Sequence, residues 1–120
     1  MFSSSTGVVA ENLKDQRVET IAAAKAAGVN YIDLNAASQA YVNKIGSTAA
    51  HVYDLSKGDS THLNQQGGVV FGRMVADLLL GHSPTIPSSA TEGEDPAGCF
   101  ASWFVADSTM STAIWTGKPA

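Results

Sequence analysis

The feature that most limits the fold of this 120-residue chain is that only one segment, residues 29–34, has the composition of a β-strand. The segment is short and rich in β-branched and aromatic residues, and helical patterns precede and follow it. A parallel strand in an α/β domain needs neighbouring strands on both edges and helices on both faces. One strand cannot supply its own sheet, so we expect the chain to be a fragment of a larger fold or to depend on a partner.

Three segments around this strand are predicted to be helical. The first, residues 8–27, is rich in Ala, Glu, Lys and Gln and ends before a glycine, which favours helix termination. The second covers residues 36–45. The third follows Asn64, a favourable N-cap, and continues to Leu80 with one apolar face.

The composition changes near Gly81. Residues 82–120 are rich in Ser, Thr, Pro and Gly and contain every proline of the chain. They are predicted to form a linker or a poorly ordered tail after residues 1–81. The aromatic side chains of Trp103, Phe104 and Trp115 have the right chemistry to stack on sugar rings, but disorder or local packing is the simpler interpretation.

Charge and composition argue against several classes of protein. Seven Lys and Arg against eleven Asp and Glu give a net charge of -4, which provides no basic surface for nucleic acid or anionic lipid. No apolar run approaches the roughly 20 residues of a membrane-spanning helix. The single cysteine, Cys99, excludes an internal disulfide and a zinc ribbon. Residues 1–5 do not have the pattern of a signal peptide.

The segment with the clearest chemical potential is residues 57–64, in which Asp59 precedes His62 by three residues just ahead of a helix. This spacing allows the carboxylate to bind one imidazole nitrogen while the other nitrogen faces a site. Such a pair is the orienting half of a Ser-His-Asp system. The spacing alone is common by chance, and a capping Asp beside a solvated His is the alternative.

Three stretches together resemble the SGNH (GDSL) hydrolases, and more narrowly their rhamnogalacturonan acetylesterase-like branch. They are residues 28–34, 44–46 and 58–64, the last followed by Gly67 and an amphipathic helix. Their order and spacing over residues 8–81 are similar to the C-terminal portion of that family. The resemblance implies an α/β fold: a partial three-layer α/β/α, flavodoxin-like arrangement with a parallel sheet whose N-terminal strands are missing.

The resemblance also implies a serine-type esterase that removes acetyl groups from pectic carbohydrate, with no metal and no other cofactor. Asp59 would orient His62, and His62 would activate a serine that forms an acetyl-enzyme. The family is mostly extracellular, so that location is expected. The alternative is a non-catalytic remnant that binds a partner or a glycan. Self-association through an exposed sheet edge is expected in either case.

The chain departs from the family in the blocks that carry the nucleophile and the oxyanion hole. The family's Gly-Asp-Ser block ends the first strand, and its oxyanion Gly and Asn follow in later blocks. Here the same letters occur at residues 58–60, but Ser60 follows no apolar strand and lies two residues from His62. We do not expect Ser60 to be the nucleophile. Loss of the nucleophile costs about a millionfold in kcat, so the chain alone is expected to be almost inactive.

Other polar residues have simpler interpretations. His51 and Asp54 mirror the spacing of the first pair, and the four residues together suggest a metal site; an exposed loop histidine is the plainer interpretation. Asp33 ends the predicted strand, where capping of the next helix is favoured over ligand binding. Arg17 interrupts the apolar stripe of the first helix, and a snorkelling side chain is favoured over a substrate clamp.

Overall fold

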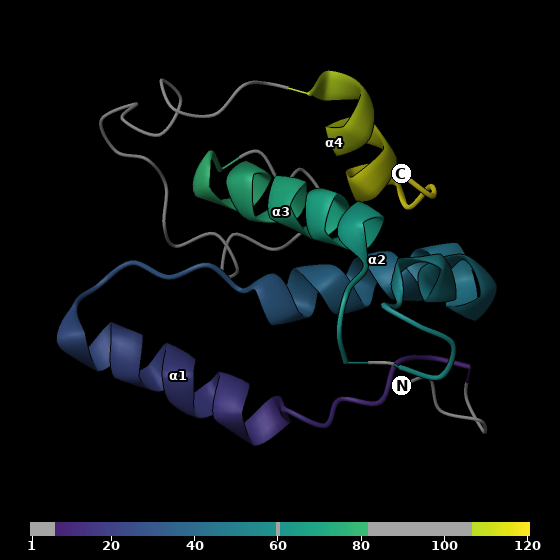
Figure 1. The fold of residues 1–120 in the computed structure, drawn as a ribbon. Helices are drawn as coiled ribbons and strands as arrows, with labels where there is room; N and C mark the ends of the chain where they lie inside the picture. Colours follow the sequence, from purple (N-terminus) through teal and green to yellow (C-terminus); the bar gives the residue numbers. More distant parts are fainter. Residues whose placement is uncertain (1–6, 60, 82–106) are drawn as a thin grey trace.

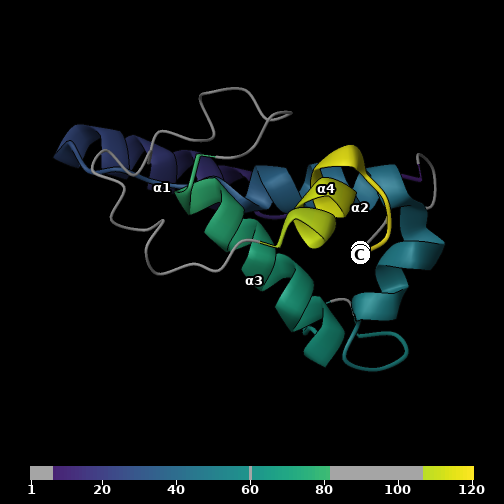
Figure 2. The same cartoon turned by 90° about the horizontal axis from the view of Figure 1, so that it is seen from above.

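The computed structural model describes residues 7–59, 61–81 and 107–120. These ranges form α1 (Lys14–Ala27), α2 (Leu34–Ala50), the 3-10 helix η1 (His51–Tyr53), α3 (Gln65–Leu79) and α4 (Ser108–Thr116). Helix α3 contacts both α2 and α4, while α1 lies on the other side of α2 from them (Figure 1). Seen from above, α3 crosses α2 at a wide angle (Figure 2). None of the helices in these ranges is both long and apolar enough to cross a membrane.

The predicted α/β fold with a parallel sheet is wrong for this part of the chain. The described residues contain no strand and no sheet edge; Asp54 and Leu63 form an isolated antiparallel bridge. Residues 29–32 are an irregular link, and α2 begins at Leu34. With no neighbouring strand, an extended segment has no ladder to join, whereas the Asp33 carboxylate accepts a hydrogen bond from Ala36 N–H at 2.9 Å and caps a helix.

The helix boundaries follow the capping residues more closely than the apolar pattern. Helix α3 begins after Asn64, whose side chain accepts from Gly67 N–H at 2.8 Å, as predicted. Helix α1 begins at Lys14 instead of residue 8, and Gly28 ends it in the left-handed conformation at φ 64°. Gly46 does not end α2: at φ 79° and ψ 164° it kinks the chain, and the helix resumes to Ala50.

The core lies where α2, η1, α3 and α4 meet. Two buried tyrosines cross it: the hydroxyls of Tyr41 and Tyr53 are 2.8 Å apart, and Tyr53 also donates to the backbone oxygen of Ala120 at 3.0 Å. Burial and the bond to Tyr53 raise the pKa of Tyr41. The buried members of this core are Ala37, Tyr41, Tyr53, Val70, Met74, Leu78, Ile114 and Trp115.

The last fourteen residues of the proline-rich region form α4 and a short C-terminal segment that pack on the other helices. The buried carboxylate of Asp77 in α3 accepts from Trp115 Nε1 at 2.8 Å, from Ser111 Oγ at 3.0 Å and from Arg73 Nε at 2.7 Å. These bonds attach α4 to α3. Residues 82–106, with Cys99, Trp103 and Phe104, lie outside the described residues.

Helix α1 is the least integrated element, because none of its residues is buried. Its main attachment is Arg17, whose Nε lies 2.9 and 2.7 Å from the two carboxylate oxygens of Asp33. Burial alone would raise the pKa of Asp33, but hydrogen bonds from Arg17 and from Ala36 N–H outweigh it, so the pKa lies below its usual range. Asp33 is confirmed as a helix cap, and Arg17 forms an ion pair instead of a snorkelling side chain.

Candidate functional site

The candidate site is carried by the loop between η1 and α3, which we call the 54–64 loop. Its two ends are joined by backbone bonds: Leu55 N–H donates to His62 O at 3.0 Å, and Asn64 N–H donates to Tyr53 O at 2.9 Å. The isolated bridge between Asp54 and Leu63 lies in the same place. The loop is therefore a short, closed hairpin whose base is fixed to the start of α3.

The structure brings Asp59 and His62 together, as the sequence spacing predicted. Asp59 Oδ1 accepts from the backbone N–H groups of Thr61 and His62, each at 2.9 Å. Asp59 Oδ2 lies 3.0 Å from His62 Nδ1. One carboxylate thus holds both the backbone and the ring of the histidine, which fixes the direction in which the ring points.

This arrangement leaves the far side of the His62 ring accessible. The side chain of His62 is 70% exposed and that of Asp59 is 22% exposed. The hydrogen bonds from the backbone of His62 and Thr61, followed by that from the His62 ring, lower the pKa of Asp59 to about 2. The carboxylate is therefore ionised near neutral pH and accepts from Nδ1–H. Neutral His62 then carries its lone pair on Nε2, where a base needs it.

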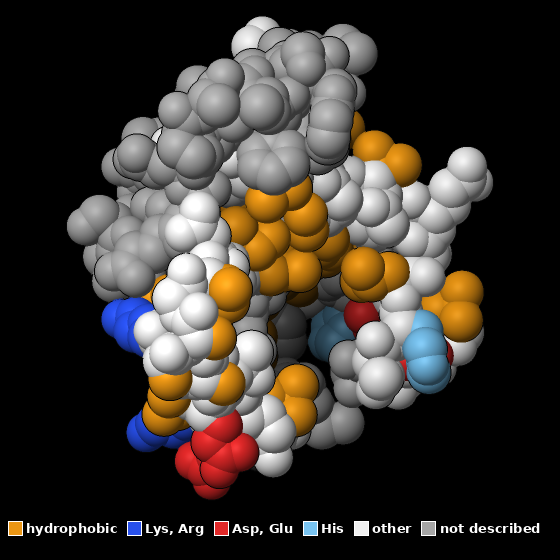
Figure 3. All heavy atoms as spheres, turned by 90° about the vertical axis from the view of Figure 1, so that its left-hand side faces the viewer, with side chains coloured by type: hydrophobic (Ala, Val, Ile, Leu, Met, Phe, Trp, Pro, Cys, Tyr) orange, Lys and Arg blue, Asp and Glu red, His pale blue; other side chains and the backbone are white. Residues whose placement is uncertain are grey.

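A second pair of the same kind lies at the other end of the loop. His51 Nδ1 is 2.7 Å from Asp54 Oδ2, with the order of the two residues reversed. Figure 3 shows two histidine side chains, each beside a carboxylate, on one side of the molecule. The four residues do not converge: in the described part of the chain, no three His, Cys, Asp or Glu side chains are close enough to hold a metal ion.

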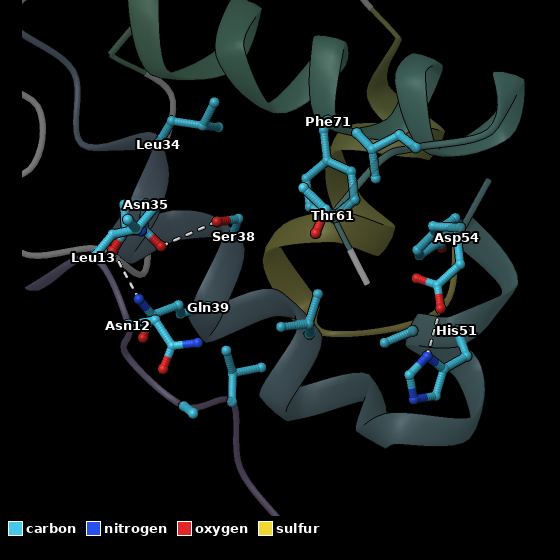
Figure 4. Close-up of a pocket in the computed structure, with 16 residues that line it drawn as sticks. Asn12, Leu13, Leu34, Asn35, Ser38, Gln39, His51, Asp54, Thr61 and Phe71 are labelled. Atoms are coloured by element: carbon cyan, nitrogen blue, oxygen red, sulfur yellow. Dashed lines mark hydrogen bonds and ion pairs between the residues drawn. The ribbon is translucent and has the colours of Figure 1, made fainter. Parts of the chain in front are cut away.

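A groove of about 750 Å³ lies beside the loop, between α2, α3 and the segment before α1 (Figure 4). His51 and Asp54 line it, whereas Asp59 and His62 do not. Thr61, the residue before His62, also lines the groove. The apolar lining comes from Val9, Ala10, Leu13, Leu34, Val42, Ala50, Leu63, Tyr53 and Phe71, and the other polar lining from Asn12, Asn35, Ser38 and Gln39.

Sequence reasoning missed the polar wall that α2 contributes to this groove. Asn35, Ser38 and Gln39 lie three and four residues apart, so they share one helix face. Ser38 Oγ donates to Asn35 O at 3.0 Å, and Gln39 Nε2 donates to Asn35 Oδ1 at 2.7 Å. The spacing of these three polar residues was the signal that was available in the sequence, although α2 also carries polar residues elsewhere, at Asn43, Lys44, Ser47 and Thr48.

The nucleophile is not among the groups that the structure brings to the imidazole. Within the described ranges no serine or threonine hydroxyl is hydrogen-bonded to His62. Ser60 lies outside the described residues. The described site therefore holds an oriented acid–base pair, and a hydroxyl would have to come from elsewhere.

Comparison with known proteins adds no further constraint. Neither the protein-family models, nor the curated proteins, nor the solved structures contain a match to this chain.

Proposed function

We propose that this chain supplies the acid–base pair of a serine-type esterase that deacetylates carbohydrate, with Asp59 orienting His62. The observation that carries this proposal is the way in which one ionised carboxylate holds His62 at its backbone N–H and at Nδ1 while the ring stays exposed. A merely solvated histidine needs no such contact, because water can hydrogen-bond both ring nitrogens. The resemblance of residues 58–64 to the last block of the SGNH hydrolases supports the same chemistry.

In this reaction His62 Nε2 takes the proton of a serine hydroxyl as the serine oxygen attacks the acetyl carbonyl. The imidazolium that forms is stabilised by the Asp59 carboxylate. His62 then returns the proton to the departing sugar oxygen, which leaves an acetyl-serine. A water molecule then gives a proton to His62 and attacks the acetyl-serine. Acetate is released as His62 returns the proton to the serine oxygen. The residues of this chain move the proton, and the serine belongs to a part of the enzyme outside the described residues.

The test uses 4-nitrophenyl acetate, because a held imidazole acts on this activated ester without a serine. Nε2 attacks the acetyl carbonyl, nitrophenolate leaves, and water hydrolyses the acetylimidazole. We expect His62→Ala and Asp59→Ala to lower the rate about tenfold, less than the 10²–10⁴-fold contribution of acid–base groups in complete sites.

The second histidine pair provides matched controls for this assay. His51→Ala and Asp54→Ala remove a pair of the same spacing that lies in η1 and at the start of the 54–64 loop, and they should leave most of the rate intact. Wild-type protein that is no faster than His62→Ala would overturn the proposal. An equal loss in His51→Ala would also overturn it, since the reaction would then belong to any exposed imidazole.

A glycan-binding module is the second candidate function, and the groove is the observation that favours it. Its carboxamides, imidazole and carboxylate can hydrogen-bond sugar hydroxyls, while its apolar lining can pack against the C–H faces of sugar rings. Titration with pectic oligosaccharides should shift the NMR signals of Thr61 and Gln39. The variant Gln39→Ala should weaken binding, whereas Gln65→Ala, on an exposed position of α3, should not. Unshifted signals would exclude this function.

A further inference from the structure

We propose that Asn64 is a positioning residue for His62, and that its side-chain amide sets the geometry of the catalytic pair from the base of the 54–64 loop. This inference rests on the proposed function of Asp59 and His62. It assigns to Asn64 a task beyond the N-cap that the sequence predicts.

Asn64 makes one hydrogen bond within α3 and two that join α3 to a separate part of the chain. Its Oδ1 accepts from Gly67 N–H at 2.8 Å and caps α3. Its Nδ2 donates to Val52 O at 2.7 Å, and its backbone N–H donates to Tyr53 O at 2.9 Å. The cap needs only the oxygen of the side chain. The Nδ2 bond is therefore an additional link, which ties the start of α3 to η1 on the far side of the loop.

Gly67 allows this link to be short. A Cβ atom at residue 67 would lie 2.8 Å from Tyr53 O, closer than real Cβ contacts, and 3.2 Å from the Cβ of Leu63, which is a tight contact. Only glycine therefore permits the first turn of α3 to approach η1 this closely. Asn64 and Gly67 together hold the two ends of the loop at a fixed separation.

That separation determines where His62 sits. His62 lies two residues before Asn64, and its backbone oxygen accepts from Leu55 N–H at 3.0 Å across the hairpin. The imidazole is thus held from two sides, by Asp59 within the loop and by the closed base beneath it. If the base opens, the bond across the hairpin lengthens and the ring loses the position in which Asp59 binds Nδ1.

The experiment compares Asn64→Asp with wild type by long-range 1H–15N NMR of the histidine rings at a pH where they are neutral. Aspartate keeps the acceptor that caps α3 but loses the Nδ2 donor to Val52 O. We expect the ratio of the Nδ1–H to the Nε2–H tautomer of His62 to fall about fivefold, the effect of one ordinary hydrogen bond.

Two further variants separate the possible outcomes. Asp59→Ala must change the His62 tautomer; if it does not, the catalytic pair itself is absent and the proposed function fails. If Asp59→Ala acts and Asn64→Asp does not, only the role of Asn64 is overturned. Asn64→Ser, which also keeps a cap but is too short to reach Val52, should repeat the effect of Asn64→Asp. If both Asn64 variants fail to fold, the proposal is also overturned, because Asn64 then holds the whole fold.

Discussion

Three aspartates in the described part of the protein accept several hydrogen bonds each, and their burial distinguishes their roles. Asp33 and Asp77 are buried and are paired with Arg17 and Arg73. Such carboxylates hold elements together, and removing one leaves a charge in a poorly hydrated place. Asp59 is bound mainly by backbone N–H groups on an accessible loop, so its effect is confined to the loop and to the histidine that it holds.

Asp59 should titrate well below the range of an ordinary aspartate. Its pKa of about 2 in the folded chain lies below the ordinary value of 3.8. A lowered pKa means that ionised Asp59 stabilises the folded loop above pH 4, and that this contribution is lost as the pH falls from about 4 through 2. The amide NMR shifts of Thr61 and His62 should report a midpoint near 2. A midpoint near 4 would show that the backbone bonds do not form.

The buried carboxylate of Asp77 should contribute strongly to the stability of the protein. Asp77→Ala removes the acceptor shared by Trp115, Ser111 and Arg73. The guanidinium of Arg73 is largely buried and would lose its ion-pair partner. We expect the free energy of unfolding to fall by about 3 kcal/mol, the loss typical of a broken buried ion pair. Urea unfolding followed by circular dichroism measures it. The exposed Asp15 provides a control, because Asp15→Ala should change the stability by less than about 0.5 kcal/mol.

At the scale of elements, backbone conformation at single glycines shapes the helices. The kink of α2 at Gly46 redirects the last turn of the helix toward η1, which carries His51 and leads into the 54–64 loop. A conformation of φ 79° and ψ 164° is accessible almost only to glycine. The shape of α2, and with it one wall of the groove, therefore depends on a residue with no side chain.

A pair of glycine substitutions tests this dependence. Neither Gly46 nor Gly68 has an atom within 4 Å of the place of an added Cβ, so both have room for alanine. Gly46→Ala should nevertheless destabilise the protein by about 1–3 kcal/mol through backbone strain. Gly68→Ala lies within α3 and should stabilise it by about 0.5–1 kcal/mol. Thermal unfolding of the two variants should move in opposite directions, and equal shifts would contradict the kink.

In the molecule as a whole, the helices contribute unevenly to the core. Helix α3 contributes Val70, Met74 and Leu78 to the core, whereas α1 contributes no buried residue. A hollow of about 270 Å³ separates α1 from residues 31–35. Large apolar side chains also remain about half exposed, among them Leu13, Val18, Val52, Leu55 and Leu63. The self-association expected from the sequence remains a prediction, and these exposed apolar side chains replace a sheet edge as its physical basis.

Hydrogen exchange tests this uneven distribution. Amides of α1 should exchange through local opening, at rates at least about 100-fold faster than those of α3, which open only when the core unfolds. Mass spectrometry of peptides from residues 14–27 and 65–79 compares the two helices in one experiment. Measurements at low and high micromolar concentration also detect association, because a second chain on α1 would slow its exchange. Equal protection at low concentration would contradict a peripheral α1.

Several features were readable from the sequence because they depend on residues three or four positions apart. The cap at Asn64, the stop at Gly28 and the pairing of Asp59 with His62 are of this kind. Turn and capping bonds form within one local segment, so their residue types predict them without knowledge of the rest of the chain.

Tertiary structure decided the remainder, because burial joins residues that are distant in sequence. Residues 29–34 have the composition of a strand, but a strand forms only where another strand pairs with it, and the described residues provide none. The proline-rich region contains α4 because Trp115 meets Asp77, 38 residues away. Likewise, His51 lines the groove and His62 does not. Both histidine pairs form between residues three positions apart, so the local sequence predicts them. Which pair faces the groove depends on how α2, α3 and the loop pack together.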